Sequence, residues 1–507
     1  MTGALPSVES FGYIIPELVL GGGAVLLFIL AAAARRRAGW HALFPWLAGI
    51  TTAAAAGLLV WGNSEGGCTG SAVFDGLIAC DPLGAFFRGL VLVAVLGGIV
   101  LSAGSPSVPE RRRGEYYGLI LVMAIGMCLL ASANHLLMIL VAMEAVSLSS
   151  YLLVGFDESR YRSSEAGLKY VLYGGVASAV MLFGMSLLYG LFGELSIQGL
   201  HAAIRDGGEV LASGAGRWAA WMGLAFIITG FGFKVAAVPF HQWCPDAYEG
   251  APTPFTALLS VGPKAAGFAL LLRFLWGLFA QPGSLDMVLQ VNIPWPLIIG
   301  LLSALTMTLG NLVAIVQNNL KRLLAYSSIA HAGYMLMGVV AGGVDGFESV
   351  TLYMAVYVFM NMGAFAVVSA VARSTGSEDI RDYRGLGWRA PWLAIVMVIF
   401  LVSLTGLPPT AGFIGKLYLF AALLAKGGTW FYVLAVVGII NSVISLFYYA
   451  RVMKAMYLEK APADAEPVRG VNSASVLASV MAVPTLLLGI FWQPLAVLAS
   501  WSARFFH

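Results

Sequence analysis

Long apolar runs separated by short polar loops dominate the chain and predict a protein built from membrane-spanning helices. A spanning helix needs about 20 mainly apolar residues, and no polar stretch between the runs is long enough to form a globular domain. We therefore expect an all-α polytopic membrane protein with about 14 transmembrane helices, placed at residues 12–34, 42–62, 82–104, 115–132, 134–156, 165–192, 217–243, 253–280, 293–317, 322–342, 346–372, 390–424, 429–456 and 474–501.

The composition agrees with a membrane protein and argues against a nucleic-acid partner. Of the 507 residues, 60% are hydrophobic and only 10% are charged, whereas a soluble domain carries about 25% charged residues. The net charge of +3 is small, and the charges are spread over short loops instead of forming one basic patch. The lipid bilayer is therefore the expected environment.

Lysine and arginine are distributed unequally between the two sets of loops, which predicts the orientation. Loops that follow odd-numbered spans hold clusters such as 35–37 and 111–113, all arginine. The opposite side has only Arg88, Arg205, Arg217, Lys426 and Arg504. Because basic loops stay on the cytoplasmic side, fourteen spans would place both termini on the outer, periplasmic side of a bacterial inner membrane.

Four ionisable residues lie near the middle of predicted spans: Glu144, Lys234, Lys264 and Lys416. A charge at the bilayer centre costs about 2.5–3.5 kcal/mol on insertion scales, and such residues by default indicate ion or proton movement. Structural ion pairing is the alternative, but one acid cannot neutralise three bases. We therefore expect a proton path in which Glu144 pairs with Lys234, Lys264 follows, and Lys416 leads to the far side.

Three further residues are candidates for secondary roles. Lys169 lies near the inner end of its span, where it would either tune Lys234 or extend to the interface. His241 follows Lys234 by seven residues, which predicts the same helical face near the inner mouth, and His331 lies in mid-span. The two histidines are candidate relays, with packed and hydrogen-bonded side chains as the alternative interpretation.

A short repeat links two of the mid-membrane lysines. Residues 230–234 read Gly-Phe-Gly-Phe-Lys and residues 412–416 read Gly-Phe-Ile-Gly-Lys, each with proline nearby. The two spans lie five apart and so cross the membrane in opposite directions. This is typical of inverted repeats with interrupted helices at the functional site, although Pro239 follows its lysine whereas Pro408 and Pro409 precede theirs.

Cysteines and common cofactor motifs add little. Cys68 and Cys80 share a predicted outer loop, where an oxidising compartment would permit a disulfide, and Cys128 and Cys244 are single. The sequence contains no metal-ligand cluster at workable spacing, no dinucleotide-binding glycine motif after a strand and no phosphate-binding loop. We therefore expect no nucleotide, flavin, metal or iron–sulfur cluster on this chain.

Several motifs resemble the antiporter-like membrane subunits of respiratory complex I. They are Glu165-Ala-Gly-Leu-Lys169-Tyr170, Pro239-Phe-His241-Gln-Trp-Cys-Pro-Asp246, Asn319-Leu-Lys321-Arg322 with His331, and Gly406-Leu-Pro408-Pro409 with Lys416. Lysine at 416 and the segment 379–386 are similar to the N type of these subunits and not to the M type. No long lateral helix follows the last span, which speaks against the L type.

The resemblance implies a fold and a function. Residues 115–281 (helices 4–8) and 282–458 (helices 9–13) would form two inverted five-helix repeats with discontinuous helices 7 and 12. Residues 1–114 would form a three-helix segment before them, and residues 459–507 would contain helix 14. Glu144, Lys169, Lys234, Lys264 and Lys416 match the positions of the family's proton path.

The chain would then be a proton-translocating subunit of a NADH-quinone oxidoreductase, flanked by K- and M-type subunits. NADH, FMN, iron–sulfur clusters and quinone would bind to partner subunits. Two alternatives stay open. One is the ion-translocating subunit of a cation/proton antiporter or membrane-bound hydrogenase, and the other is a membrane scaffold that does not pump.

Overall fold

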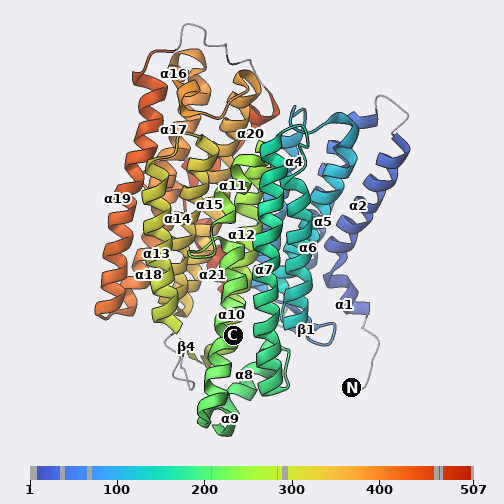
Figure 1. Cartoon of the computed structure of the whole chain (residues 1–507), viewed down its shortest axis with the longest axis vertical. Helices are drawn as coiled ribbons and strands as arrows, with labels where there is room; N and C mark the ends of the chain where they lie inside the picture. Colours follow the sequence, from blue (N-terminus) through green and yellow to red (C-terminus); the bar gives the residue numbers. More distant parts are fainter. Residues whose placement is uncertain are drawn as a thin grey trace.

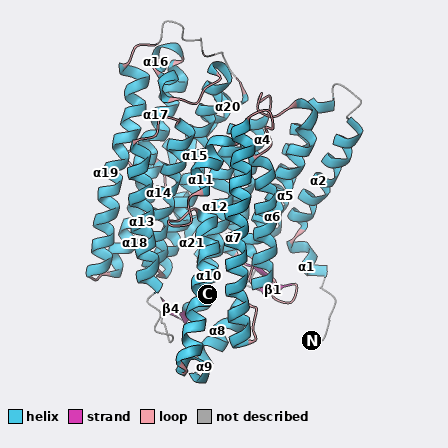
Figure 2. Ribbon diagram, viewed as in Figure 1, coloured by secondary structure: helices cyan, strands magenta, loops and turns pink. Residues whose placement is uncertain are grey.

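The computed structural model describes residues 8–34, 40–64, 71–206, 208–281, 284–287, 295–461, 468 and 472–503. Most of its helices run side by side along one axis (Figures 1 and 2). Among the described residues, 13 helices are long and apolar enough to cross a membrane. The predicted all-α polytopic membrane fold is therefore confirmed.

The first half of the chain runs from α1 to α12. The helices before the predicted first repeat are α1 (Val8–Tyr13), α2 (Ile15–Ala34), η1 (Trp40–Ala42), α3 (Phe44–Ser64), α4 (Pro82–Ser102) and η2 (Glu110–Arg112). The helices that follow are α5 (Arg113–Ser132), α6 (Leu136–Val154), α7 (Tyr161–Phe192), α8 (Ile197–Asp206), α9 (Gly208–Ala212), α10 (Gly214–Val235), α11 (Trp243–Gly250) and α12 (Thr253–Phe279).

The second half begins at α13. Its helices are α13 (Trp295–Ile315), α14 (Leu320–Ala341), α15 (Gly343–Thr375), η3 (Ile380–Tyr383), α16 (Leu386–Arg389), α17 (Pro391–Thr405), α18 (Ala411–Lys426), α19 (Thr429–Leu458), α20 (Ser473–Ile490) and α21 (Gln493–Ala503). Two small antiparallel hairpins, which the sequence did not predict, pair β1 (Ser71–Val73) with β2 (Ile78–Cys80) and β3 (Ala280–Gln281) with β4 (Ser284–Met287).

Three predicted spans are interrupted. The seventh was expected at 217–243, but α10 ends at Val235 and residues 236–242 are not helical. The twelfth, expected at 390–424, is divided into α17 and α18 by residues 406–410, where Gly406 has φ +87°. The last, expected at 474–501, is divided into α20 and α21. The interruptions predicted in the seventh and twelfth spans are therefore present.

The centre of the molecule is formed by α12, α14 and α15. Almost all of each of these helices is buried within the protein, whereas α3 and α19 expose most of their apolar residues. In a bilayer such exposed apolar faces are solvated by lipid, so burial and not hydrophobicity distinguishes the central helices. Polar side chains on α12 and α14 consequently lie inside the protein, away from lipid.

Ion pairs connect the basic loops at one end of the bundle. Arg112 lies 2.7 Å from Glu158, Arg160 lies 3.8 Å from Glu378, and Arg384 lies 2.7 Å from Glu459. These contacts join the loops that follow α4, α6, α15 and α19. The loops predicted to share one side of the membrane therefore meet one another.

The structure describes only one of the two cysteines in the predicted disulfide. Cys80 is disulfide-bonded, and Cys128 and Cys244 are free and buried. The predicted partner, Cys68, lies outside the described residues.

Candidate functional site: buried lysines in mid-bundle

Lys234 lies in the last turn of α10 and is almost completely buried. Its ammonium donates a hydrogen bond of 3.1 Å to the Ser147 hydroxyl on α6. Ser147 follows Glu144 by three residues, so the two side chains share one face of that helix. No ion pair joins Glu144 to Lys234 in the part of the chain that the structure describes, and the Oε1 atom of Glu144 is buried without a hydrogen-bond partner there.

Lys264 lies in the middle of α12, directly after Pro263, and is 1% exposed. Its ammonium donates to the Ser328 carbonyl at 2.7 Å and also to the Ser328 hydroxyl. The Tyr248 hydroxyl lies 3.4 Å from the same serine hydroxyl. Ser328 belongs to α14, so this contact joins the two halves of the chain.

Lys416 lies in α18, after the second interruption. Its ammonium donates to the carbonyl of Thr405 at 2.8 Å and to the Ser442 hydroxyl at 3.2 Å, and it lies 4.4 Å from the centre of the Tyr334 ring. Thr405 is the last residue of α17, so the ammonium binds the end of a helix whose carbonyls and dipole favour a cation.

One face of α14 connects Lys264 to Lys416. Ser328, His331 and Tyr334 recur every three residues along it, and the first and last of them contact the two lysines. His331 lies between them, 2.6 Å from the Tyr353 hydroxyl and 3.3 Å from the Tyr449 hydroxyl. Hydroxyls and a neutral imidazole each donate and accept hydrogen bonds, so this face can carry a proton between neighbouring groups.

Sequence reasoning identified His331 but missed the groups around it, Ser328, Tyr353 and Tyr449. The only available signal was the spacing of Ser328, His331 and Tyr334 at a helical period. Serine and tyrosine are common in helix contacts within membranes, so that spacing alone does not distinguish a relay from packing.

Lys169 and His241 do not lie in the middle of the bundle. Lys169 is 42% exposed and pairs with Glu165 at 2.8 Å and with Asp246 at 2.9 Å. The prediction that His241 shares a helical face with Lys234 is wrong, because α10 ends at Val235 and His241 lies in the non-helical segment that follows. The Nδ1 atom of His241 is buried without a hydrogen-bond partner among the described residues.

A charged cluster surrounds Lys169 at the end of the bundle where the basic loops meet. Arg322 lies 2.6 Å from Asp246 and 3.0 Å from Glu249, and the cluster lines a cavity of about 250 Å³. Burial raises the pKa of Asp246, but hydrogen bonds from Arg322 and Lys169 outweigh it and hold that pKa below its usual range. Asp246 is therefore charged at neutral pH.

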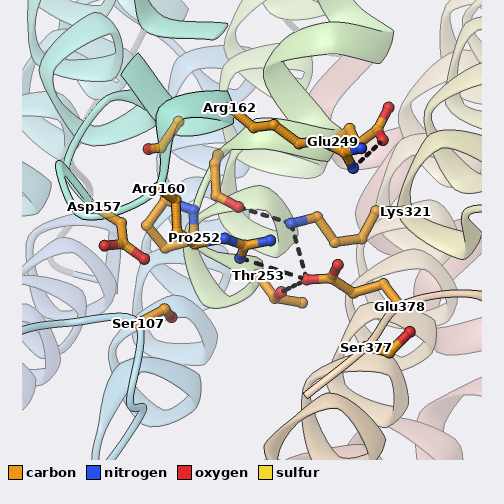
Figure 3. A network of polar contacts seen from close by, with 12 residues as sticks. Ser107, Asp157, Arg160, Arg162, Glu249, Pro252, Thr253, Lys321, Ser377 and Glu378 are labelled. Atoms are coloured by element: carbon orange, nitrogen blue, oxygen red, sulfur yellow. Dashed lines mark hydrogen bonds and ion pairs between the residues drawn. The ribbon is translucent and has the colours of Figure 1, made fainter. Parts of the chain in front are cut away.

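Lys321 lies next to this cluster and is completely buried (Figure 3). Its ammonium lies 2.8 Å from the Ala251 carbonyl and 3.5 Å from Glu378, which also accepts a hydrogen bond of 3.4 Å from Thr253. Lys321 precedes the span predicted at 322–342, and that prediction would place it in a loop. Its burial follows from the packing of α14 against the start of α12.

Three lysines held by neutral oxygens inside a bundle with interrupted helices define an antiporter-like, multi-spanning membrane subunit. Among the described residues, no group of three or more His, Cys, Asp or Glu side chains could hold a metal ion. The sequence pattern of the family described as NADH:quinone oxidoreductase/Mrp antiporter, transmembrane, matches residues 133–445, and the chain belongs to this family.

Known relatives agree with this assignment. The chain is 48% identical over 466 residues to NADH-quinone oxidoreductase subunit N of Anaeromyxobacter sp. (strain Fw109-5), covering 90% of this chain and 89% of the relative. A chain of respiratory complex I from Thermus thermophilus is 32% identical, with a TM-score of 0.76 over 96% of this chain and all of that one. A chain of the Mrp complex from Dietzia sp. DQ12-45-1b has a TM-score of 0.81 over 98% and 97%, but its 22% identity shows a shared fold alone.

Proposed function

We propose that the chain is a proton-translocating membrane-arm subunit of a NADH-quinone oxidoreductase. Protons would move along Glu144, Lys234, Lys264 and Lys416, driven by redox chemistry on other subunits. One observation carries the proposal. Each of the three lysines is buried at mid-bundle, and within the described residues its ammonium donates hydrogen bonds only to neutral oxygens.

Burial of an ammonium inside a protein costs free energy unless a carboxylate compensates its charge. The cost is removed when the lysine loses its proton to a neighbouring group. The protonation state of such a lysine therefore changes when another charge approaches or leaves. Glu144, one turn from Ser147, is the acid that can hold or release Lys234 in this way.

The second step crosses from one half of the chain to the other. A proton released near Lys264 would pass along Ser328, His331 and the tyrosine hydroxyls beside it, and would reach Lys416. Lys169 and the carboxylates around it lie at the basic end of the bundle, where they would tune entry from that side. His241 would be a secondary group near the same mouth.

The basic end of the bundle would face the cytoplasm of a bacterial cell, with both termini on the periplasmic side of the inner membrane. Residues 115–281 and 282–458 would be the two inverted repeats. K- and M-type subunits would flank the chain, and quinone, NADH, FMN and iron–sulfur clusters would bind elsewhere in the complex.

The relatives favour this function over a cation/proton antiporter or a membrane-bound hydrogenase. The Mrp likeness concerns the fold, whereas the relative at 48% identity is a subunit of a NADH-quinone oxidoreductase. If the chain were a scaffold without transport, the free-energy cost of burying three lysines would serve no function.

The test is Lys234→Met in the assembled complex. We expect normal subunit content but at least about a tenfold loss of coupled turnover, equivalent to about 1.4 kcal/mol in the barrier. Proton uptake by inverted membrane vesicles, measured with a fluorescent pH-gradient dye during NADH oxidation, provides the readout.

Lys454→Met is the matched control, because Lys454 is largely exposed and pairs with Glu459 at the basic end of the bundle. Near-normal pumping by an intact complex with Lys234→Met would contradict the proposed path.

A further inference from the structure

Glu378 lies between the solvent at the basic end of the bundle and the start of α12. Its side chain is 12% exposed, whereas that of Lys321, 3.5 Å away, is completely buried (Figure 3). Arg160 lies 3.8 Å from the same carboxylate oxygen, and the Thr253 hydroxyl donates a hydrogen bond of 3.4 Å to it. Among these groups, Glu378 is the proton acceptor that reaches both solvent and α12.

The backbone fixes the position of this carboxylate. The amide of Leu320 donates to the Glu378 carbonyl at 2.8 Å, and the amide of Ile380 donates to the Asn318 carbonyl at 2.9 Å. The side chain of Glu378 is thereby held next to Thr253, the first residue of α12. The dipole of a helix favours an anion at its N-terminus, so a carboxylate is well placed there.

One face of α12 carries hydroxyls from this point to Lys264. Thr253, Thr256, Ser260 and Lys264 follow one another at spacings of three, four and four residues, and all four are buried. Side chains at these spacings are neighbours on a helix, with Cβ atoms about 5–6 Å apart, a separation that one water molecule can bridge between two hydroxyls. The row extends about 16 Å along the helix, from the basic end to mid-bundle.

Asn361, on α15, offers a place for water beside this row. Its Nδ2 atom donates a hydrogen bond of 2.7 Å to the Ser260 hydroxyl. Its Oδ1 atom is buried and has no hydrogen-bond partner among the described residues. Buried polar atoms are nearly always paired with protein or with water, and buried waters typically bind such atoms. A water molecule bound to this Oδ1 atom would lie beside the hydroxyl row.

We propose that Glu378 is a proton-loading residue that supplies Lys264 from the basic end, separately from Lys234. The proposal rests on the proposed function. The Glu378 carboxylate takes a proton from solvent water and donates it to the Thr253 hydroxyl. Each hydroxyl of the row gives its own proton to the next hydroxyl or bridging water, and the last proton binds the neutral amine of Lys264. Lys321 compensates the charge of the carboxylate between transfers.

The test uses the assembled complex in inverted membrane vesicles, with NADH:quinone turnover under coupled conditions as the readout. Glu378→Gln keeps the volume of the side chain but cannot take up a proton. We expect turnover to fall at least about tenfold, since a positioned proton-transfer group typically contributes a factor of roughly 10²–10⁴. Glu459→Gln is the matched control, because Glu459 is also a partly buried carboxylate between two cations at the basic end, Arg384 and Lys454.

Formate distinguishes proton transfer from a structural role of the ion pairs. Glu378→Ala leaves space for this small carboxylic acid, which can carry the proton in place of the side chain. We expect formate to raise the turnover of Glu378→Ala several-fold and to leave the turnover of Lys234→Met unchanged. A defect caused by displaced helices would not respond to formate.

Two hydroxyl variants test the row without changing the ion pairs. Thr256→Val and Ser260→Ala should each lower turnover several-fold, because each removes one group that both donates and accepts a hydrogen bond. Thr52→Val is their control, because the buried Thr52 hydroxyl donates to the Ala48 carbonyl within α3, at 2.8 Å. The hydroxyl variants decide the question if Glu378→Gln does not assemble.

Subunit content confirms that each variant is assembled. Near-normal turnover of Glu378→Gln, an equal loss in Glu459→Gln, or no response of Glu378→Ala to formate would each overturn the proposed entrance. Hydroxyl variants that match Thr52→Val would do the same. Lys234→Met separates the two proposals: normal pumping by that variant contradicts the whole path, whereas its loss together with a normal Glu378→Gln contradicts the entrance alone.

Discussion

The interrupted seventh and twelfth spans carry the same short motif, yet their lysines lie on opposite sides of the interruption. Lys234 precedes the break in the last turn of α10, whereas Lys416 follows the break and reaches back to the Thr405 carbonyl at the end of α17. In both cases a lysine lies at the C-terminal end of the first half-helix, where the helix dipole favours a cation. The shared feature is this placement and not the order of lysine and proline.

The surroundings of the two lysines differ. Lys234 contacts a hydroxyl on the same helix face as an acid, Glu144, whereas the contacts of Lys416 are a carbonyl, a hydroxyl and an aromatic ring. The first site can be switched by its own carboxylate. On the proposed path the second would respond to a proton that arrives along α14, so we expect substitutions to affect the two sites differently.

Arginine at either position should have the largest effect. Because arginine stays protonated in proteins, Lys234→Arg and Lys416→Arg keep the charge and remove the exchange. We expect at least about a tenfold loss of proton pumping for each, measured in inverted vesicles alongside the exposed control Lys454→Arg. Pumping within twofold of the parent would show that a fixed cation is sufficient there.

Gly406→Ala tests the second break alone. Gly406 has φ +87°, and an added Cβ would lie 2.7 Å from the Cδ atom of Lys416. We expect a several-fold loss of pumping, because the lysine must move and the left-handed backbone costs about 1–2 kcal/mol. Gly376→Ala is the control, since Gly376 also has left-handed backbone, with φ +68°, and an added Cβ would meet nothing within 4 Å. Equal effects of the two changes would attribute the loss to backbone strain and not to Lys416.

Substitutions can distinguish the contribution of Glu144 from that of Ser147, the serine that contacts Lys234. We expect Glu144→Gln to reduce pumping less than Glu144→Ala, because the amide keeps the volume and a hydrogen-bonding group. Combined with Ser147→Ala, Glu144→Gln should show a coupling of about 0.5–1 kcal/mol, since the effects of residues that share a partner, here Lys234, are not additive. Additive losses would indicate that the two residues act on Lys234 independently.

The smallest effect concerns Asp246, on the short helix beyond the first break. Its pKa is below the usual range, so its ion pairs stabilise the fold at any pH above that range and are lost as pH falls through the lowered value. Asp246→Asn should lower the melting temperature by about 2 °C or less at neutral pH, as for a partly exposed pair. The difference from the parent should shrink in strong acid. A difference in melting temperature that grows in acid would contradict a stabilising role for the charged form of Asp246.

Hydrophobicity predicted the spans closely. The helix predicted at 253–280 is observed at Thr253–Phe279, and that predicted at 429–456 is observed at Thr429–Leu458. The length of an apolar run is a local property, so it can be determined from the amino-acid sequence alone. The ends of interrupted helices depend on tertiary contacts instead, so the sequence placed His241 on a helix that had already ended.

The partners of the lysines were less predictable than the lysines. A charged residue in an apolar run is conspicuous, whereas Ser147, Ser328 and Thr405 are ordinary helix residues until folding places an ammonium beside them. Thr405 contributes only its carbonyl, which no side-chain pattern could indicate. The acceptors of the path therefore depend on packing between helices distant in sequence.

The contact between Lys264 and Ser328 has a consequence for how such a chain can evolve. The donor belongs to the part before residue 281 and both acceptor oxygens belong to the part after residue 295. Neither part is self-sufficient at this point, even if both descend from one ancestral unit. Recombination could replace one half of the chain by that of a distant relative only if the contact between Lys264 and Ser328 were kept. This requirement ties the inheritance of the two halves together.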